Sequence, residues 1–414
     1  MIITLKIILL LFGSFLYLFT AGCVKQDKTD GVVQDKSGAI GSLTDKPLAV
    51  YQKELLALAF QMASEIPTDP NIKDRSRAQE KVVAAALVLD QPKQAAGFIE
   101  KIDNWRRGTC YGDLALYCVS RGYTGEARQY VERAIPVPGV AQDWHKEQIM
   151  AKIAAVYTLL GEHALAEQYE KTIANSERGK VAKVKATSIG NDSFSEQVHN
   201  LDALIATGKF DVVEDALKVY ANLFNRYYTD AERRSLVEEK MKTSWSTLPI
   251  FKRVELLSLL AGFALDHSDQ AKALALVNEA RGFIDNARWP PEYRISLISK
   301  LIKLQFRAGD TQKAKTDADA LLAFFDLQRD KIVNIYRAEP LRLLAEAYQS
   351  MGDMAAALVI YKRAVEEGIE NPNSRPRAED LSATSLSMAL HRVEPDAELW
   401  TRMRQINKGL RDPW

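Results

Sequence analysis

Four basic residues in the C-terminal half of the sequence could bind carboxylates: Lys300, Lys303, Arg307 and Arg342. The first three recur at three- and four-residue spacing, which places them on one face of a helix. Arg342 lies at the comparable face of the next expected first helix. We call these four residues the basic stripe, and their cationic groups could clamp carboxylates through charge-assisted hydrogen bonds. The alternative is a solvated helix face, since Glu339 and Glu346 lie close enough to neutralise part of it.

The sequence offers little for other chemistry. No histidine pairs with another His, Cys or carboxylate in a metal-ligand motif, and the five are His145, His163, His199, His267 and His391. The Gly-Lys pair at 208–209 is not a phosphate-binding loop, because Ala203 and Phe210 stand where that loop needs Gly and Ser or Thr. No carboxylate pair stands out from a solvated face. We therefore expect no cofactor, no metal and no enzymatic activity, and a cryptic hydrolase is the remotest alternative.

Two cysteines, Cys110 and Cys118, lie in the body of the chain. On one helix they would be about 12 Å apart along the axis, beyond the limit of about 7 Å between the Cα atoms of a disulfide. A buried, inert Cys118 is expected on a helix, whereas Cys110 near a helix start could be more reactive. An extended loop at 104–112 would instead permit a bridge.

Four tryptophans suggest a second binding chemistry. Trp105, Trp144, Trp245 and Trp289 all lie near the boundaries of the helical units described below. Exposed tryptophan rings could bind a glycan, whereas buried ones would pack under the loops between units.

The elements that must position these residues are helical hairpins. In residues 341–368, apolar and small residues recur at three- and four-residue spacing on both sides of Gly352-Asp353. Gly accepts the left-handed conformation that ends helices, so the segment predicts helix, turn and helix. Ala345 and Ala357 are expected where the two helices approach closely, with Tyr348 and Tyr361 filling the space around them.

This unit resembles a tetratricopeptide repeat, a 34-residue helix-turn-helix. The residues that carry the resemblance are Leu344, Ala345, Tyr348, Gly352, Ala357, Tyr361 and Ala364. A second copy keeps the same offsets at Leu114, Ala115, Cys118, Gly122, Ala127, Val131 and Ala134. With weaker copies the expected turns lie at Asp90, Gly122, Gly161, Gly208, Ser268, Gly309 and Gly352. The resemblance implies an all-α solenoid of about seven hairpins, whose first helices line a concave surface that grips an extended peptide or a partner helix.

The spacing between turns is irregular, which predicts longer helices or loops between some units. An extra helix is expected at 230–244. A capping helix is expected at 396–410, where Leu399, Met403, Ile406 and Leu410 form one apolar stripe. The helical repeat domain spans 48–414, and an irregular all-α bundle is the alternative.

The N-terminal residues predict where in the cell the protein lies. Lys6 precedes an apolar run, and Ala21-Gly22 leads into Cys23, as in a secretory signal. The sequence from Thr20 to Cys23 resembles the lipobox of a bacterial lipoprotein, although Thr20 stands where Leu is usual. The resemblance implies a signal peptide at 1–22 and lipidation, for example with palmitate, at Cys23. An uncleaved anchor is the alternative, because about 20 apolar residues can span a bilayer.

Residues 23–47 comprise the lipidated Cys23 and a polar tether without periodicity. Since Val24 follows Cys23, the resemblance implies the outer membrane, with the protein facing the periplasm. The formal net charge is +1, so the chain has no large overall positive charge that would attract nucleic acid. The expected role is a lipid-anchored scaffold or adaptor of the cell envelope that binds another envelope protein or peptide. A glycan-binding lipoprotein is the alternative, and self-association is open.

Overall fold

The computed structural model describes residues 43–135, 143–173 and 194–411. Within these ranges all regular secondary structure is helical, as expected for an all-α fold. The predicted signal peptide, the lipidation site Cys23 and most of the tether lie outside the described residues. Of the predicted tether, residues 43–46 pack on the helices, because Leu43 is buried and the Lys46 amide donates to the Asp90 carbonyl.

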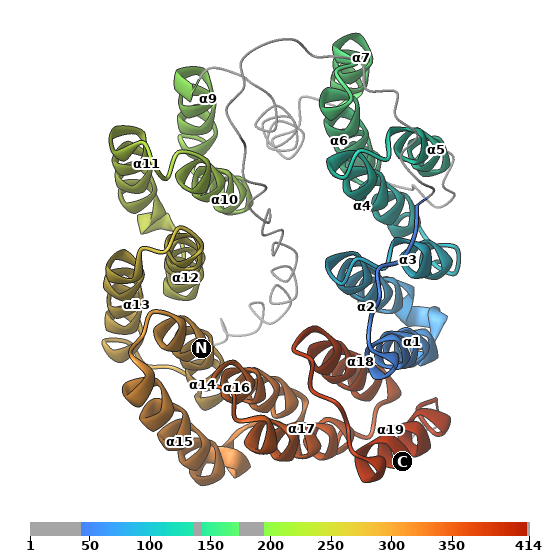
Figure 1. Cartoon of the computed structure of the whole chain (residues 1–414), viewed down its shortest axis with the longest axis vertical. Coiled ribbons are helices and arrows are strands. Elements are labelled where there is room, and N and C mark those ends of the chain that lie inside the picture. The colour runs from blue at the N-terminus through green and yellow to red at the C-terminus, as the bar shows by residue number, and fades with distance from the viewer. Residues whose placement is uncertain (1–42, 136–142, 174–193, 412–414) are drawn as a thin grey trace, which may run out of the picture.

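The helices form two layers that curve together, as Figure 1 shows. The inner layer contains α2 (Thr68–Val88), α4 (Arg106–Ser120), α6 (Asp143–Leu159), α10 (Phe210–Arg226), α12 (Ile250–Asp266), α14 (Pro291–Arg307), α16 (Ala338–Ser350) and α18 (Ser374–Leu390). The outer layer contains α1 (Val50–Glu65), α3 (Pro92–Ile99), α5 (Thr124–Ala134), α7 (His163–Thr172), α11 (Ala231–Ser244), α13 (Gln270–Asp285), α15 (Thr311–Gln328), α17 (Met354–Ile369) and α19 (Ala397–Lys408). The helix α9 (Phe194–Ile205) precedes α10 and packs against it.

Each predicted turn lies between two helices that pack together. All seven turn residues have a positive φ: Asp90, Gly122, Gly161, Gly208, Ser268, Gly309 and Gly352. In the hairpin of α16 and α17, the Asp353 amide donates to the Tyr348 carbonyl at 3.0 Å, which closes the end of α16. The Asp353 carboxylate then accepts from the Ala356 amide and begins α17. The turn predictions are therefore confirmed.

The residues predicted to fill the hairpins are buried. The alanines where the helices approach closely are fully buried, namely Ala115, Ala127, Ala345, Ala357 and Ala364. Tyr361 is also fully buried, and Tyr348 is 4% exposed. Small residues at these positions let the helices of a pair approach closely, so the pattern read from the sequence corresponds to the packing.

The extra helix predicted at 230–244 is present as α11. It packs on α10 as its outer partner. The helix α10 continues the inner layer to α12 because its buried residues surround much of its circumference, whereas α11 buries only Val237 and Met241. Turn spacing alone does not distinguish these two environments.

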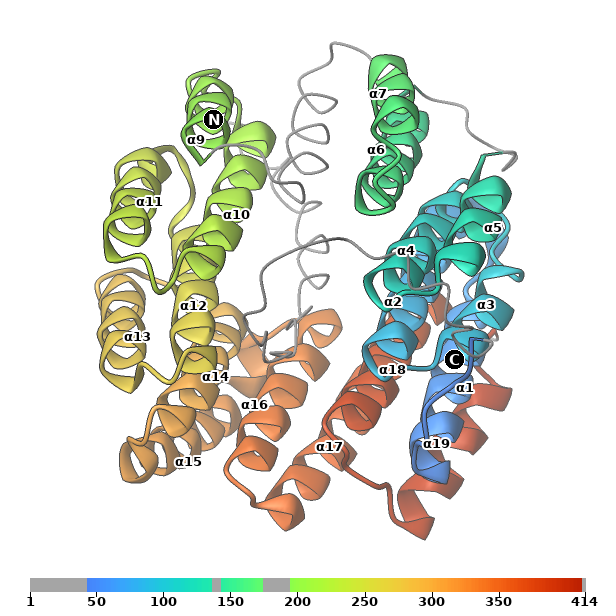
Figure 2. The same ribbon diagram turned by 45° about the horizontal axis from the view of Figure 1, so that its top comes forward.

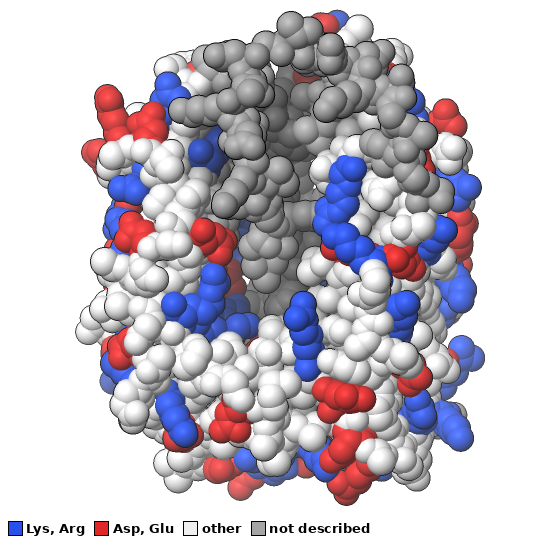
Figure 3. All heavy atoms as spheres, viewed as in Figure 1, with Lys and Arg blue, Asp and Glu red and all other residues white. Residues whose placement is uncertain are grey.

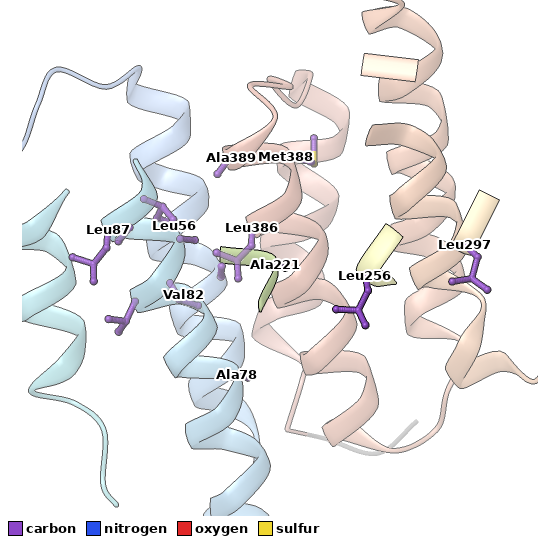
Figure 4. Close-up of a cluster of buried hydrophobic side chains, with 14 of the residues drawn as sticks. Leu56, Ala78, Val82, Leu87, Ala221, Leu256, Leu297, Leu386, Met388 and Ala389 are labelled. Atoms are coloured by element: carbon purple, nitrogen blue, oxygen red, sulfur yellow. The ribbon is translucent and has the colours of Figure 1, made fainter. Parts of the chain in front are cut away.

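The first and the last described helices of the chain lie together. The N-terminal helix α1 packs extensively against α18, more so than against α2, which follows it directly. Figures 1 and 2 show α1, α18 and α19 side by side. Figure 4 shows Leu56 of α1 and Leu386 of α18 in one cluster of buried hydrophobic side chains. The expected apolar stripe of α19 is buried at Leu399, Met403, Ile406 and Leu410, and α19 contacts α1.

Candidate functional site: the charged inner surface

The basic stripe lies on the inner layer, and three of its members form ion pairs with neighbouring inner helices. Lys300 Nζ is 3.4 Å from Glu255 Oε1, and Arg307 Nη2 is 2.9 Å from Asp266 Oδ1, both on α12. Lys303 Nζ turns to the other side and lies 2.9 Å from Glu346 Oε2 on α16. The stripe is therefore not a free cationic surface, and its prediction as a binding groove stays a prediction.

Lys303 belongs to a network that joins four helices. The Ser387 hydroxyl of α18 donates to Glu346 Oε1 at 2.7 Å, and it is itself 2.7 Å from the Tyr361 hydroxyl of α17. His391 Nε2 lies 3.6 Å from Glu346 Oε2. Burial alone would raise the pKa of Glu346, but the charges of His391 and Lys303 and the Ser387 bond outweigh it and lower the pKa to about 2. Glu346 is thus held as a carboxylate.

Arg342 lies in a different environment from the other three members of the stripe. Its Nη1 atom is buried and has no hydrogen-bond partner. The nearby charges include Lys81 of α2 and Asp380 of α18, so Arg342 lies where α2, α16 and α18 converge. Burial raises the pKa of Asp380 to about 7, against the opposing effect of Arg342. When this carboxyl group ionises near neutral pH, it adds one negative charge beside Arg342 and Lys81.

Ion pairs of the same kind connect the inner helices along both arms of the curved layer. The pairs are Glu214–Lys252, Glu255–Lys300, Asp266–Arg307, Lys303–Glu346, Asp74–Arg375, Glu80–Arg106 and Asp113–Lys152. We call these seven pairs the inner ladder. Figure 3 shows Lys and Arg side chains gathered along the inner edge, over α12 and α14 on one side and over α4 and α6 on the other. Each cation of the ladder thus has a carboxylate partner on a neighbouring inner helix.

Most of the ladder is not predicted from the sequence. The closeness of Glu346 to the stripe is predicted, but the pairing of Glu255 and Asp266 with it from the preceding inner helix is not. The partners are 41 to 45 residues apart along the chain, as the sequence separations of Arg307–Asp266 and Lys300–Glu255 show. A search for opposite charges at that separation on successive first helices could have predicted these two ion pairs.

Similarity to characterised proteins assigns no role to this surface. No family model matches the chain, and a search of curated proteins finds no significantly similar sequence. The role of the inner surface must therefore be inferred from its geometry and chemistry.

The tryptophans considered for glycan binding are not exposed platforms where they are described. Trp105 and Trp245 are 5% and 6% exposed. Trp105 stacks on His145, with ring centroids 4.0 Å apart, and the Trp289 indole donates to the Ile284 carbonyl at 2.9 Å. The side chain of Trp144 lies outside the described residues. Trp105 and Trp245 are therefore packing residues, whereas Trp289 is half-buried.

Neither of the two cysteine thiols in the helical domain is accessible for a reaction. Cys110 and Cys118 both lie on α4, are free and are fully buried. Burial raises the pKa of both thiols, that of Cys118 to about 12, so they remain protonated and unreactive. In the described ranges, no group of three or more metal-ligating side chains could hold a metal ion, and no helix is long and apolar enough to cross a membrane.

Proposed function

We propose that this protein is a lipid-anchored scaffold or adaptor of the cell envelope, and that its inner surface binds another protein. The proposed body is a tetratricopeptide-like solenoid that acts without catalysis. The lipid anchor at Cys23 is proposed from the residues of the N-terminus alone, since they lie outside the described structure.

The solenoid assignment is supported by the repeated geometry of the hairpins. Positive φ recurs at each predicted turn, and buried alanines recur where the paired helices approach closely. Stacked hairpins each bury one face against a neighbour, so each arm presents an inner surface built from successive helices. Such a surface suits a long partner segment that contacts several helices at once.

The observation that carries the binding proposal is the partial exposure of the paired cations on α14. The side chains of Lys300 and Arg307 are 35% and 49% exposed, although both have carboxylate partners. Exposed ion pairs of this kind contribute only about 0–1 kcal/mol, so a carboxylate of a partner can replace Glu255 or Asp266 at little cost. The exchange would select an acidic segment over a basic one.

The test is crosslinking in intact cells followed by capture of the full chain. A variant with Lys300→Gln and Arg307→Gln removes both exchangeable cations without reversing their charge, so the inner helices keep their packing. We expect a partner that crosslinks to the wild-type chain to be lost from this variant.

A matched control removes two cations from the outer layer. Lys362 and Arg402 pair with acidic residues and are 32% and 39% exposed, close to the values on α14. Lys362→Gln with Arg402→Gln should retain the partner. Equal recovery from both double variants would refute the role of α14, and the absence of any protein partner from the wild type would refute the scaffold.

A further inference from the structure

Lys303 and His391 lie beside the same carboxylate oxygen on the inner layer. Lys303 Nζ is 2.9 Å from Glu346 Oε2, and His391 Nε2 is 3.6 Å from the same atom. The two nitrogens are themselves 3.3 Å apart. Two positive charges at that distance repel each other, so the arrangement suits one cation at a time.

The hydrogen bonds of His391 define where its proton lies. Nδ1 is 2.9 Å from the Ser387 carbonyl, which can only accept, so Nδ1 carries a hydrogen. Nε2 faces the ammonium of Lys303, which can only donate, so Nε2 accepts through its lone pair. These contacts therefore belong to a neutral imidazole with its hydrogen on Nδ1.

Glu346 is held in place whichever cation it binds. Its side chain is 3% exposed, and its Oε1 atom accepts from the Ser387 hydroxyl at 2.7 Å. That hydroxyl is in turn 2.7 Å from the hydroxyl of the fully buried Tyr361. An unpaired buried charge is costly, so Oε2 keeps one cation beside it. Lys303 and His391 are the two groups within reach.

Protonation of His391 changes which group binds Glu346. Nε2 then carries a hydrogen that it can donate to Oε2, while the bond from Nδ1 to the Ser387 carbonyl stays. His391 directly follows the last residue of α18, where the negative end of the helix dipole favours a positive charge. Lys303 loses its acceptor on the imidazole and faces a second cation. Its side chain is 28% exposed, so it can turn to solvent.

Other charged groups around His391 leave this balance intact. The turn that follows contributes Arg392 and Glu394, which carry opposite charges and both act on Tyr51 of α1. On α17 the Tyr361 hydroxyl is neutral, because burial raises the pKa of this phenol well above its usual range. The charges of α2 described above face the first half of α18. The charge at the imidazole is therefore governed by the ammonium from α14 and the carboxylate from α16.

We propose that protonation of His391 displaces Lys303 from Glu346 and so adds a third exchangeable cation to the inner surface. Lys303 lies on the same face of α14 as Lys300 and Arg307. An imidazole ordinarily changes its charge between about pH 5 and pH 8, so the exchange needs no extreme condition. An acidic partner segment then binds more tightly at mildly acidic pH. The exchange follows from the contacts above, whereas its effect on binding rests on the function proposed above.

The first test is NMR of the full-length chain with 15N-labelled histidines, titrated from pH 8 to pH 5. At pH 8 His391 should show the tautomer with its hydrogen on Nδ1. Lys303→Gln keeps a donor but removes the charge, so the midpoint of the His391 titration should rise by about one pH unit. By linkage, a charge that opposes protonation of His391 is displaced by that protonation to the same extent.

Lys300→Gln is the matched control for this titration. It removes a cation from the same face of α14, but one that pairs with Glu255 on α12, so the midpoint should stay unchanged. The signals of the other four histidines report whether each variant keeps its fold. A hydrogen on Nε2 at pH 8, or equal midpoints in the wild type and Lys303→Gln, would overturn the proposal.

The second test measures the binding of a fluorescent peptide of alternating Asp and Ser at pH 5.5 and pH 8. The peptide is ionised at both values. The wild type should bind up to about fivefold more tightly at pH 5.5, as expected for one added exposed ion pair. His391→Gln should lose this difference, although Asp380 titrates in both chains. Equal pH dependence would refute the effect on binding. Absence of binding at either pH would refute the acidic partner proposed above, while the NMR titration still decides the exchange.

Discussion

The folded structure raises the pKa of one aspartate, Asp380, into the neutral range. It lies on α18 close to Gly368 of α17, and its charged neighbours are Arg342 and Glu339 on α16, Lys81 on α2 and Glu379 on α18. Burial raises its pKa to about 7, and the two glutamates act in the same direction. The carboxyl group is therefore protonated in the folded protein at mildly acidic pH.

This shift has a defined sign. In the unfolded chain an aspartate titrates near pH 4. Between about pH 4 and pH 7 the unfolded carboxyl ionises while the folded one keeps its proton, so this residue lowers stability as pH rises through that window. Asp380→Asn removes the ionisation, and the free energy of unfolding at pH 8 should rise by about 1–3 kcal/mol.

Urea unfolding at pH 4 and pH 8 checks this expectation. At pH 4 the variant and the wild type should have nearly equal stability. Asp330→Asn is the control, because the Asp330 side chain is 94% exposed and should leave the pH dependence unchanged. A wild type and an Asp380→Asn variant with the same pH profile would contradict the assignment.

At this scale the sequence predicted part of the site. The spacing of Lys300, Lys303 and Arg307 placed them on one face of α14, and the closeness of Glu346 to the stripe was visible from the repeat alignment. The contributions of Asp380 and His391 were not visible, because they come from α18, whose turn at Arg392 carries neither Gly nor a helix-turn signal. Contacts between helices of different repeats depend on a register that irregular spacing does not reveal.

At the scale of the hairpin, close approach of paired helices depends on small side chains. Ala357 is fully buried on α17, in the position where the sequence predicts contact with α16. Ala357→Leu inserts three heavy atoms into a filled space and should lower the free energy of unfolding by about 1–3 kcal/mol through overpacking. Thermal unfolding followed by circular dichroism measures the change.

Ala355 offers a matched control, because it is exposed on the same helix. Ala355→Leu makes the same chemical change outside the contact and should alter stability by less than about 0.5 kcal/mol. Equal effects from the two substitutions would mean that the helix contact is placed wrongly.

Elements were predicted more completely than the site. Five of the seven turn residues are Gly, which accepts a positive φ, and this is a local signal. Asp90 and Ser268 were placed from the repeat pattern. The extra helix predicted at 230–244 is also present, as α11, but its place in the outer layer was not predicted. Inner and outer helices differ in how much of their circumference is buried, and that depends on neighbours beyond the hairpin.

At the scale of the whole molecule, the contacts of α1 and α2 with α18 and α19, which we call the seam, hold the two arms of the curve together. Ala59→Arg should separate α1 from α18 while leaving the hairpins intact, since each hairpin is stabilised by its own contacts and its neighbours. In dilute solution the radius of gyration from X-ray scattering should increase at nearly unchanged helicity. Ala355→Arg, on an exposed position of α17, should leave both unchanged.

An unchanged radius in the Ala59→Arg variant would show that the seam does not hold the arms together. The sequence could not have predicted this closure. A repeat motif specifies a hairpin and its immediate neighbours, whereas closure depends on the small rotation between units accumulated over the array. The buried Gln52 gives no signal of its own, because its acceptor is the backbone carbonyl of Ala389.

The separation of the two halves of the seam also determines when the protein can finish folding. Gln52 and Ala389 are 337 residues apart, so a ribosome delivers α1 long before α18. At about 5–20 residues per second, α1 waits on the order of 20–70 s for its partner. During that interval the face of α1 that packs on α18, which includes Leu56 and Met62, stays uncovered. Until α18 has been made and has folded onto it, this face of α1 is open to water and to other chains.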